Sequence, residues 1–396
     1  MLTIVRRSVY RCFGSGKMLC AFLFLFFIPS SSFGQTWKWT TETVDTYGVQ
    51  TSIAIDQDQN LHLSYFSGGV KYAFRAADSS RWFTMGIAPP AGYEELFTGL
   101  KLDSGGNPHI CFTPAVLKYA AFENHSWNTQ QIDPQSGLIE YSCSLAIAAD
   151  GTRHVLWYQY GNPQGGYYLH LKYAVLEKGA WMARTVDFDM QAGKWNCLVL
   201  DPQGNPHVSY DSFIKGEMKY AYWDGKEWKR SVVDSPNISP KGPYSHGLGN
   251  SLVLNRDGKA QISYEDGELG GSANSESSLK YAWEKDNSWK IDIIDNITVT
   301  GSWIGYRTRQ ALDPQGNPHI VYEDAGAVKH AYWDGSKWRI QVVSAPGPKR
   351  HRYENIAIDR VGNIYVSYQD AADGSLKVSI GRPEVPAQNA SNEKKP

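Results

Sequence analysis

Short apolar runs separated by Gly, Asp and Asn recur along the chain, and they recur in the same order. The eight residues LDPQGNPH occur twice, at 200–207 and 312–319. Aligning the chain on the aspartate of this octapeptide gives seven units, with that position at 56, 103, 148, 201, 255, 313 and 359. Successive units are 45 to 58 residues apart. A period of this size is typical of repeat architectures such as propellers.

Each unit contains four runs of β type. The octapeptide joins the first run to the second, a third run follows as LKYAA or MKYAY, and a fourth begins with Trp after a polar turn. Aromatic and β-branched runs between Gly and Asp turns predict a four-stranded antiparallel meander. Seven such sheets predict an all-β fold, a seven-bladed β-propeller of four-stranded blades.

The seventh unit lacks its Trp run. It ends at LKVSIGRP, and a matching run, WKWTTETVD, lies at residues 37–45. We therefore expect the N-terminal strand to complete the last blade, because an unfinished sheet would expose a strand edge. The propeller is expected to span residues 35–382. Residues 383–396 have no apolar pattern and are expected to form a disordered tail.

Residues 1–34 have the pattern of a secretory signal peptide. Four cations (Arg6, Arg7, Arg11 and Lys17) precede a short apolar run, and small residues follow it, so we expect cleavage before Gln35. An uncleaved signal anchor and a start at Met18 stay as alternatives. The remaining chain has 35 basic and 40 acidic side chains, which is unlike a nucleic-acid-binding protein. We expect a secreted or periplasmic monomer with no membrane span after cleavage.

Three cysteines remain after the signal: Cys111, Cys143 and Cys197. An odd number leaves at least one thiol outside any intrachain bridge. Cys143 and Cys197 open the inner strands of adjacent blades, and we expect two buried thiols there rather than a bridge. No zinc-type spacing, phosphate loop, dinucleotide fingerprint or EF-hand loop occurs, so neither a metal nor a cofactor is predicted. Calcium at the acidic ends of the second strands stays as an alternative.

The octapeptide itself is typical of a tight turn, because Asp accepts hydrogen bonds, Pro presets φ and Gly tolerates positive φ. Its histidine recurs as His62, His109, His154, His207 and His319. One residue repeated around a ring is unsuited to be a single catalytic base. We therefore expect these histidines, like the repeated Trp and KYA residues, to be structural.

The turn WDGSKW, Trp333–Trp338, resembles a degenerate Asp box. It departs from that pattern because Asp334 and Gly335 are adjacent, the Thr is absent and the spacing to the Trp is one residue short. With its repeats, the whole mature chain resembles secreted propellers of the sialidase-like and lectin-like superfamily, built from BNR or Asp-box repeats. The same turn is similar to that of fucose-binding propeller lectins. The resemblance implies a ligand at the mouth of the central channel, on the face opposite the tight turns.

Two cations break the repeat at the ring axis. In the sixth unit the first position of the inner strand is Arg309. The other six units have small or short polar residues there: Ser52, Gly99, Ser144, Cys197, Ser251 and Asn355. Two residues further along, Lys101 replaces the usual Ala or Val. We interpret Arg309 and Lys101 as ligand-binding residues. The alternative is a cation paired with an acid inside the channel.

Long loops are expected to mark the functional face, because binding residues concentrate on loops held by a rigid scaffold. The long segments are 158–170, 234–250, 265–278 and 295–308. Candidate binding residues on or near the loop face are Trp303, Tyr306, Arg307, Tyr244, His246, His351, Arg352, Tyr353, Asp211, Glu265, Glu323, Asp324 and Asp370. Arginines bind carboxylates and aromatic rings stack on cations and sugars, so the set indicates a glycan, and an acidic one suits it. The alternative is a set of solvated loop residues.

Three functions fit these residues. The first is a lectin-like binding propeller with one composite site, because the loops on this face do not repeat from blade to blade. The second is a glycan-active enzyme. The third is a protein-interaction scaffold, since the fold alone does not decide function.

The enzyme alternative takes two forms. For a sialidase-like hydrolase, the resemblance implies an arginine triad and a Tyr–Glu nucleophile pair, which Arg307, Arg309, Arg352, Tyr306 or Tyr353, and Glu323 could supply. The Arg-Ile-Pro motif is absent, and that enzyme fold has six blades. For a polysaccharide lyase, His246 with Tyr244, or His351 with Tyr353, has the required residue types.

Overall fold

The structure is a computed structural model of the 396-residue chain. It describes residues 35–89, 97–113, 116–133, 139–162, 166–189, 191–235, 244–268, 275–286, 288–299, 308–347 and 352–384. The regular elements within these ranges are β-strands, arranged in seven four-stranded antiparallel sheets. The described ranges contain no helix that is long and apolar enough to cross a membrane.

Six blades consist of four consecutive strands each. Blade 1 contains β2 (Val49–Ile55), β3 (Leu61–Phe66), β4 (Val70–Arg75) and β5 (Phe83–Ala88). Blade 2 contains β6 (Thr98–Leu102), β7 (Pro108–Phe112), β8 (Lys118–Glu123) and β9 (Ser126–Gln131). Blade 3 contains β10 (Ile139–Ile147), β11 (Arg153–Asn162), β12 (Gly166–Glu177) and β13 (Ala180–Asp187). Blade 4 contains β14 (Ala192–Leu200), β15 (Pro206–Ser212), β16 (Glu217–Trp223) and β17 (Trp228–Asp234).

The remaining blades follow the same order. Blade 5 contains β18 (Tyr244–Leu254), β19 (Ala260–Glu268), β20 (Ser275–Lys285) and β21 (Ser288–Val299). Blade 6 contains β22 (Arg309–Leu312), β23 (Pro318–Asp324), β24 (Ala327–Trp333) and β25 (Trp338–Ser344). Blade 7 contains β26 (Arg352–Ile358), β27 (Ile364–Gln369) and β28 (Leu376–Pro383), and its fourth strand is β1 (Trp37–Asp45).

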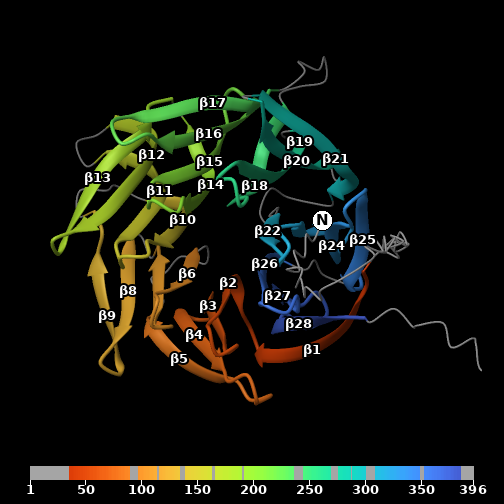
Figure 1. Cartoon of the computed structure of the whole chain (residues 1–396). Helices are drawn as coiled ribbons and strands as arrows, with labels where there is room; N and C mark the ends of the chain where they lie inside the picture. The colour runs from red at the N-terminus through yellow and green to blue at the C-terminus, as the bar shows by residue number, and fades with distance from the viewer. Residues whose placement is uncertain are drawn as a thin grey trace, which may run out of the picture. The chain divides into compact units, whose positions relative to one another are not determined.

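The first strand of each blade contacts the first strand of the next, and β26 of blade 7 contacts β2 of blade 1. The seven sheets therefore close into a ring, with these strands innermost (Figure 1). The sequence prediction of a seven-bladed propeller is confirmed. Each interface between blades has its own cluster of buried apolar side chains, so the core is divided into wedges rather than gathered in one centre.

The N-terminal strand completes blade 7, as the sequence predicted. Strand β1 pairs antiparallel with β28, from Trp37 opposite Pro383 to Asp45 opposite Leu376. The indole of Trp37 is buried and packs edge-on against the rings of His319, His330 and Tyr332 in blade 6, at centroid distances of 5.2, 5.3 and 4.7 Å. The closing strand is thus held both by its ladder and by the neighbouring blade.

In blades 2 to 6, the Trp near the start of the fourth strand links its blade to the preceding one. Its ring packs edge to face against the aromatic residue of the preceding third strand. The pairs are Tyr72–Trp127, Tyr119–Trp181, Tyr173–Trp228, Tyr220–Trp289 and Tyr281–Trp338, with centroids 5.0 to 5.4 Å apart. Such pairs add about 0.5–1.5 kcal/mol beyond the area that they bury.

The aspartate at the end of the fourth strand makes a second link, to the following blade. Asp187 in blade 3 accepts hydrogen bonds from the Tyr210 hydroxyl (2.8 Å) and the Lys219 ammonium (2.6 Å) of blade 4. The same Asp–Tyr–Lys arrangement is formed by Asp45 with Tyr65 and Lys71, by Asp234 with Tyr264 and Lys280, and by Asp295 with Tyr322 and Lys329. The lysine of the KYA run is therefore part of the blade interface.

The octapeptide histidines join the inner tight turn to the third strand, in agreement with the structural role predicted for them. In blade 1, Nδ1 of His62 lies 2.7 Å from the Tyr72 hydroxyl and Nε2 lies 3.3 Å from the Asp56 carboxylate. Burial lowers the pKa of His62, and Asp56 opposes that shift. Blade 3 differs, because Ala148 stands at the position of the turn aspartate.

A disulfide replaces a polar contact near the ring axis. Near the axis, a residue on the second strand of one blade hydrogen-bonds to the inner strand of the next blade, as Ser64 does to Thr98 (2.9 Å). Equivalent pairs are Ser209–Asn250, Ser263–Thr308 and Ser367–Thr51. Between blades 2 and 3 the pair is Cys111 and Cys143, which form a disulfide with Cα atoms 6.3 Å apart. The expectation of a buried thiol at Cys143 was wrong because its partner is Cys111; Cys197 is free.

Replacing both Cys111 and Cys143 with Ser should lower the free energy of unfolding by about 2–4 kcal/mol, since the bridge closes a 32-residue separation in the unfolded chain. Guanidinium unfolding under oxidising conditions measures the loss. Cys197→Ser is the control and should leave the midpoint close to that of the wild type. Equal midpoints for the double variant and the wild type would show that the bridge does not stabilise the ring.

Trp37→Ala should destabilise the protein by about 3–5 kcal/mol, because a buried indole is lost at the point where the ring closes. Lys38→Ala, an exposed change on the same strand, should stay within about 0.5 kcal/mol of the wild type. Thermal unfolding followed by tryptophan fluorescence compares the two variants. Similar melting temperatures for both would contradict the closing role of Trp37.

Candidate functional site

The long segments expected to mark the functional face lie at the end of the blades where the inner strands begin. Parts of them, at 163–165, 236–243, 269–274 and 300–307, are outside the described residues, as is the following inter-blade segment at 348–351. Trp303, Tyr306, Arg307 and His351 are among these residues. For Tyr244, His246, Arg352 and Tyr353 only the backbone is described, in β18 and β26. The roles expected of these eight residues stay predictions. The site is therefore built from the strands beneath these loops.

Arg309 is the first residue of β22 and is half-buried between blades 5 and 6. Its Nη1 donates to the backbone oxygens of Asn250 (3.2 Å) and Thr308 (3.1 Å). Burial lowers the pKa of the guanidinium, while the neighbouring Cys197 and Glu354 act in the opposite direction. Arg309 is thus held in the wall of the ring by backbone oxygens, with the carboxyl group of Glu354 near enough to influence it.

Three buried glutamates from consecutive blades lie close enough to affect one another. Glu265 on β19 is 2% exposed, Glu323 on β23 is 7% exposed and Glu354 on β26 is 1% exposed. Burial, followed by the charges of Glu323 and Glu354, raises the pKa of Glu265 well above its usual range. Oε1 of Glu323 also accepts from the backbone N–H of Gly326 at 2.6 Å. The cluster favours a protonated carboxyl at Glu265 beside other acids.

Asp211 occupies the same repeat position in blade 4 as Glu265 and Glu323 do in blades 5 and 6. It is fully buried, and Oδ1 accepts from the backbone N–H of Trp195 at 2.9 Å. Within the described part of the chain, Oδ2 has no hydrogen-bond partner. Burial raises the pKa of Asp211 to about 7, although the Trp195 bond opposes the shift.

The remaining predicted binding residues, Asp324, Asp370 and Lys101, have other surroundings. Asp324 is paired with Lys329 at 2.5 Å, and Asp370 with Lys377 at 2.9 Å, so the third-strand lysine of the same blade neutralises each. Lys101 is exposed and pairs in register with His109, next to the tight turn. Arg309 pairs with Val321, further from its turn. The two cations that break the repeat are therefore at different levels of the ring.

Glu354 was missed by the sequence interpretation. It stands one position before the inner-strand position of Arg309 and Asn355, where the other blades have Thr51, Thr98, Cys143, Asn196, Asn250 and Thr308. Where the preceding blade has Ser on its second strand, the residue at this position hydrogen-bonds to that Ser across the interface between the two blades. Glu354 instead follows blade 6, which has Val321 at the position of the Ser. The alignment that singled out Arg309 would have identified Glu354 if it had been extended by one residue.

No group of three or more His, Cys, Asp or Glu side chains within the described ranges is arranged to hold a metal ion. The three glutamates and Arg309 instead form a mixed, largely buried polar cluster across blades 5, 6 and 7. Such a cluster can exchange hydrogen bonds with a polar ligand, and the raised pKa of Glu265 makes that carboxyl a candidate proton donor.

No protein-family profile matches this sequence, and a search of curated proteins finds no match. Among solved structures, the chain is similar to polysaccharide lyase Uly1, with a TM-score of 0.53 and 11% identity over 88% of this chain and 99% of that one. It is also similar to the Penicillium chrysogenum alpha-L-arabinanase complexed with arabinobiose (TM-score 0.51, 14% identity, 74% and 95% covered). A third is the WD40 propeller domain of Doa1 (0.51, 14%, 89% and 97%). At these identities the likeness shows the propeller fold.

Asp211→Asn should make the protein's stability less dependent on pH. Folded Asp211 keeps its proton up to about pH 7, while an unfolded aspartate loses it near pH 4, so stability due to this residue falls as the pH rises between them. Asn keeps the Oδ1 acceptor and removes the titration. Urea unfolding at pH 5 and pH 7.5 measures the free energy of unfolding. Its decrease from the lower to the higher pH should be smaller for the variant than for the wild type.

Other buried groups also make stability depend on pH: Glu265 lowers it as the pH rises, and the buried histidines raise it. These groups are present in both the variant and the wild type, so their contributions cancel when the two proteins are compared. The same pH dependence in the two proteins would show that Asp211 does not titrate in this range.

Proposed function

We propose that the protein is a secreted propeller that binds a glycan on the face where the inner strands begin, beside the central channel. The observation that carries the proposal is the cluster of Arg309, Glu265, Glu323 and Glu354, because it interrupts a repeat whose axis is otherwise lined by small and short polar residues. Buried charged groups are costly, so their concentration at one part of the ring favours a functional role.

The chemistry of the cluster suits a hydroxyl-rich ligand. Carboxylates accept hydrogen bonds from hydroxyl groups, a protonated Glu265 can donate one, and a guanidinium can donate to ring or carboxylate oxygens. An acidic glycan would be favoured if Arg307 and Arg352 lie beside Arg309, as the sequence interpretation expects. Two glycan-related proteins, the lyase and the arabinanase, share the architecture, which supports the proposal at the level of ligand class.

A second candidate, a glycan-active enzyme, is favoured by one specific observation. Glu265 has a raised pKa while Glu323 and Glu354 lie near it. Two carboxyl groups held in different protonation states form the general acid and base, or acid and nucleophile, of glycoside hydrolysis. The sialidase-like and lyase versions of this candidate both rest on loop residues named from the sequence. The scaffold alternative is supported only by the fold.

Arg309→Ala should weaken glycan binding about tenfold or more, because it removes charge-assisted hydrogen bonds worth roughly 1.5–3 kcal/mol. A glycan array with neutral and acidic members measures this, beside a turnover screen on sialosides, uronate polymers and arabinans. Lys290→Ala, an exposed change on β21, is the matched loss of a cation and should bind like the wild type.

Each outcome of this experiment separates the candidates. Binding without turnover, lost in Arg309→Ala, supports the binding propeller. Turnover that falls at least 100-fold in Glu265→Gln supports the enzyme and overturns the first proposal. No binding and no turnover in the folded wild type overturns both and favours the scaffold.

A further inference from the structure

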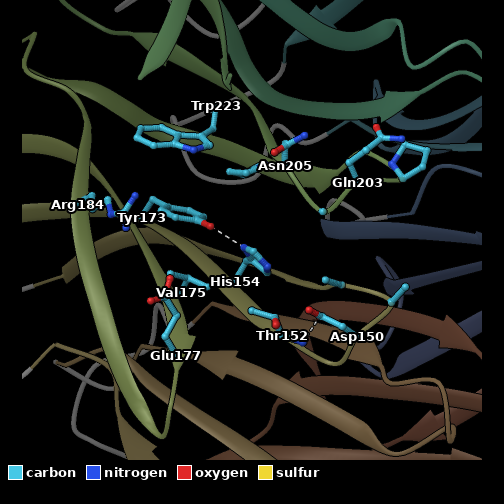
Figure 2. Close-up of a pocket in the computed structure, with 15 residues that line it drawn as sticks. Asp150, Thr152, His154, Tyr173, Val175, Glu177, Arg184, Gln203, Asn205 and Trp223 are labelled. Carbon is cyan, nitrogen blue, oxygen red and sulfur yellow. Dashed lines mark hydrogen bonds between the residues drawn. The ribbon is translucent and has the colours of Figure 1, made fainter. Parts of the chain in front are cut away.

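A cavity of about 510 Å³ lies between blades 3 and 4. It is lined by the tight turns at 148–152 and 202–206, and by side chains that include His154, Tyr173 and Trp223 (Figure 2). These turns are at the opposite end of the inner strands from Arg309, so the cavity is separate from the cluster described above. Its volume falls within the range of small-ligand sites, about 300–1,000 Å³.

His154 in this cavity lacks the partner that its counterparts have. In blades 1, 2, 4 and 6 the turn aspartate places a carboxylate oxygen 3.3 to 3.7 Å from the histidine Nε2. In blade 3 that position is Ala148. His154 is 6% exposed, its Nδ1 lies 2.5 Å from the Tyr173 hydroxyl, and its Nε2 has no hydrogen-bond partner in the part of the chain that the structure describes.

The protonation of His154 fixes what it can offer. Burial lowers its pKa to about 4, with Asp150 opposing, so the ring is neutral at physiological pH. In blades 1, 2 and 4 Nε2 faces a carboxylate and carries the proton, while Nδ1 accepts from the tyrosine hydroxyl. We assign the same tautomer to His154, which leaves an Nε2–H donor where the repeat has an acceptor. Figure 2 shows the ring between Tyr173 and the turn residues Asp150 and Thr152.

The rest of the lining mixes donors, acceptors and an aromatic surface. Gln203 and Asn205 contribute amides, Arg184 lies 5.3 Å from the Trp223 ring, and Asp150 and Glu177 contribute carboxylates. Two carboxylates against one guanidinium disfavour an anionic ligand. A sugar hydroxyl both accepts and donates, and the apolar face of a sugar ring can lie against an indole. A neutral sugar therefore uses each kind of group in the lining.

We propose that this cavity is a second binding site, which takes one residue of a neutral sugar, with a hydroxyl oxygen accepting from Nε2 of His154 in place of the absent aspartate carboxylate. The site does not depend on the function proposed above, because no residue is shared between the two. Its position follows from the sequence, since among the blades with the histidine only blade 3 lacks an aspartate at the turn.

Ala148→Asp tests the proposal by restoring the repeat. The new carboxylate should bind His154 as its counterparts do, occupy the place of the sugar hydroxyl and leave the melting temperature equal or higher. Saturation-transfer NMR of the full chain with methyl glycosides of neutral hexoses and pentoses should give signals for the wild type that fall at least tenfold in Ala148→Asp. Asn255→Asp adds the same charge at the same repeat position in blade 5 and should bind like the wild type.

Two further variants make the result specific. Trp223→Ala should also weaken binding, and it supplies a second test if Ala148→Asp is poorly folded by circular dichroism. Arg309→Ala should leave this binding unchanged, so failure of the channel site and failure of this site are distinguishable. The proposal is overturned if no neutral sugar binds, if glucuronate gives the stronger signal in Arg309→Ala, in which the channel site is weakened, or if both Ala148→Asp and Trp223→Ala bind like the wild type.

Discussion

The contact between one blade and the next holds the molecule together, because a four-stranded sheet with two apolar faces is covered only when it has a neighbour on each side. Two repeated devices make that contact. The fourth-strand Trp packs on the aromatic residue of the preceding blade, as Trp228 does on Tyr173, and the aspartate that ends the strand binds a Tyr and a Lys of the following blade, as Asp187 does. Stability in such a repeat protein is close to a sum of neighbour terms, so weakening any one interface weakens the closed ring.

The repeated residues hydrogen-bond to one another, so positions where a residue departs from the repeat point to candidate binding sites. At one end of the inner strands the small axial residues give way to Arg309 and Glu354, and buried carboxyls gather around them. At the other end, the replacement of an aspartate by Ala148 leaves His154 with a polar atom that the protein does not use. The first departure adds charge and the second removes it, yet each leaves a group able to bind a ligand.

The sequence was sufficient for the number of blades and for closure by residues 37–45, because both follow from aligning one turn. It was also sufficient to single out Arg309, whereas Glu354 required the same alignment extended by one residue. The Cys111–Cys143 bridge could not be read from the repeat without knowing that a second strand meets the inner strand of the next blade. The pairing of Asp324 with Lys329, and the cavity beside His154, likewise depend on which side chains converge in space.

The meeting of β1 with β28 has a consequence for how the chain is made. Gln35 donates to the backbone oxygen of Glu384 at 2.9 Å, across 349 residues. A ribosome produces β1 before the other described strands and β28 after them, so six blades can assemble while β1 waits for the other three strands of blade 7. A nascent chain is therefore an open arc with apolar faces at both ends, and it needs protection from aggregation until translation has passed β28. Any product truncated before that strand would keep those faces exposed and be recognisable as unfinished.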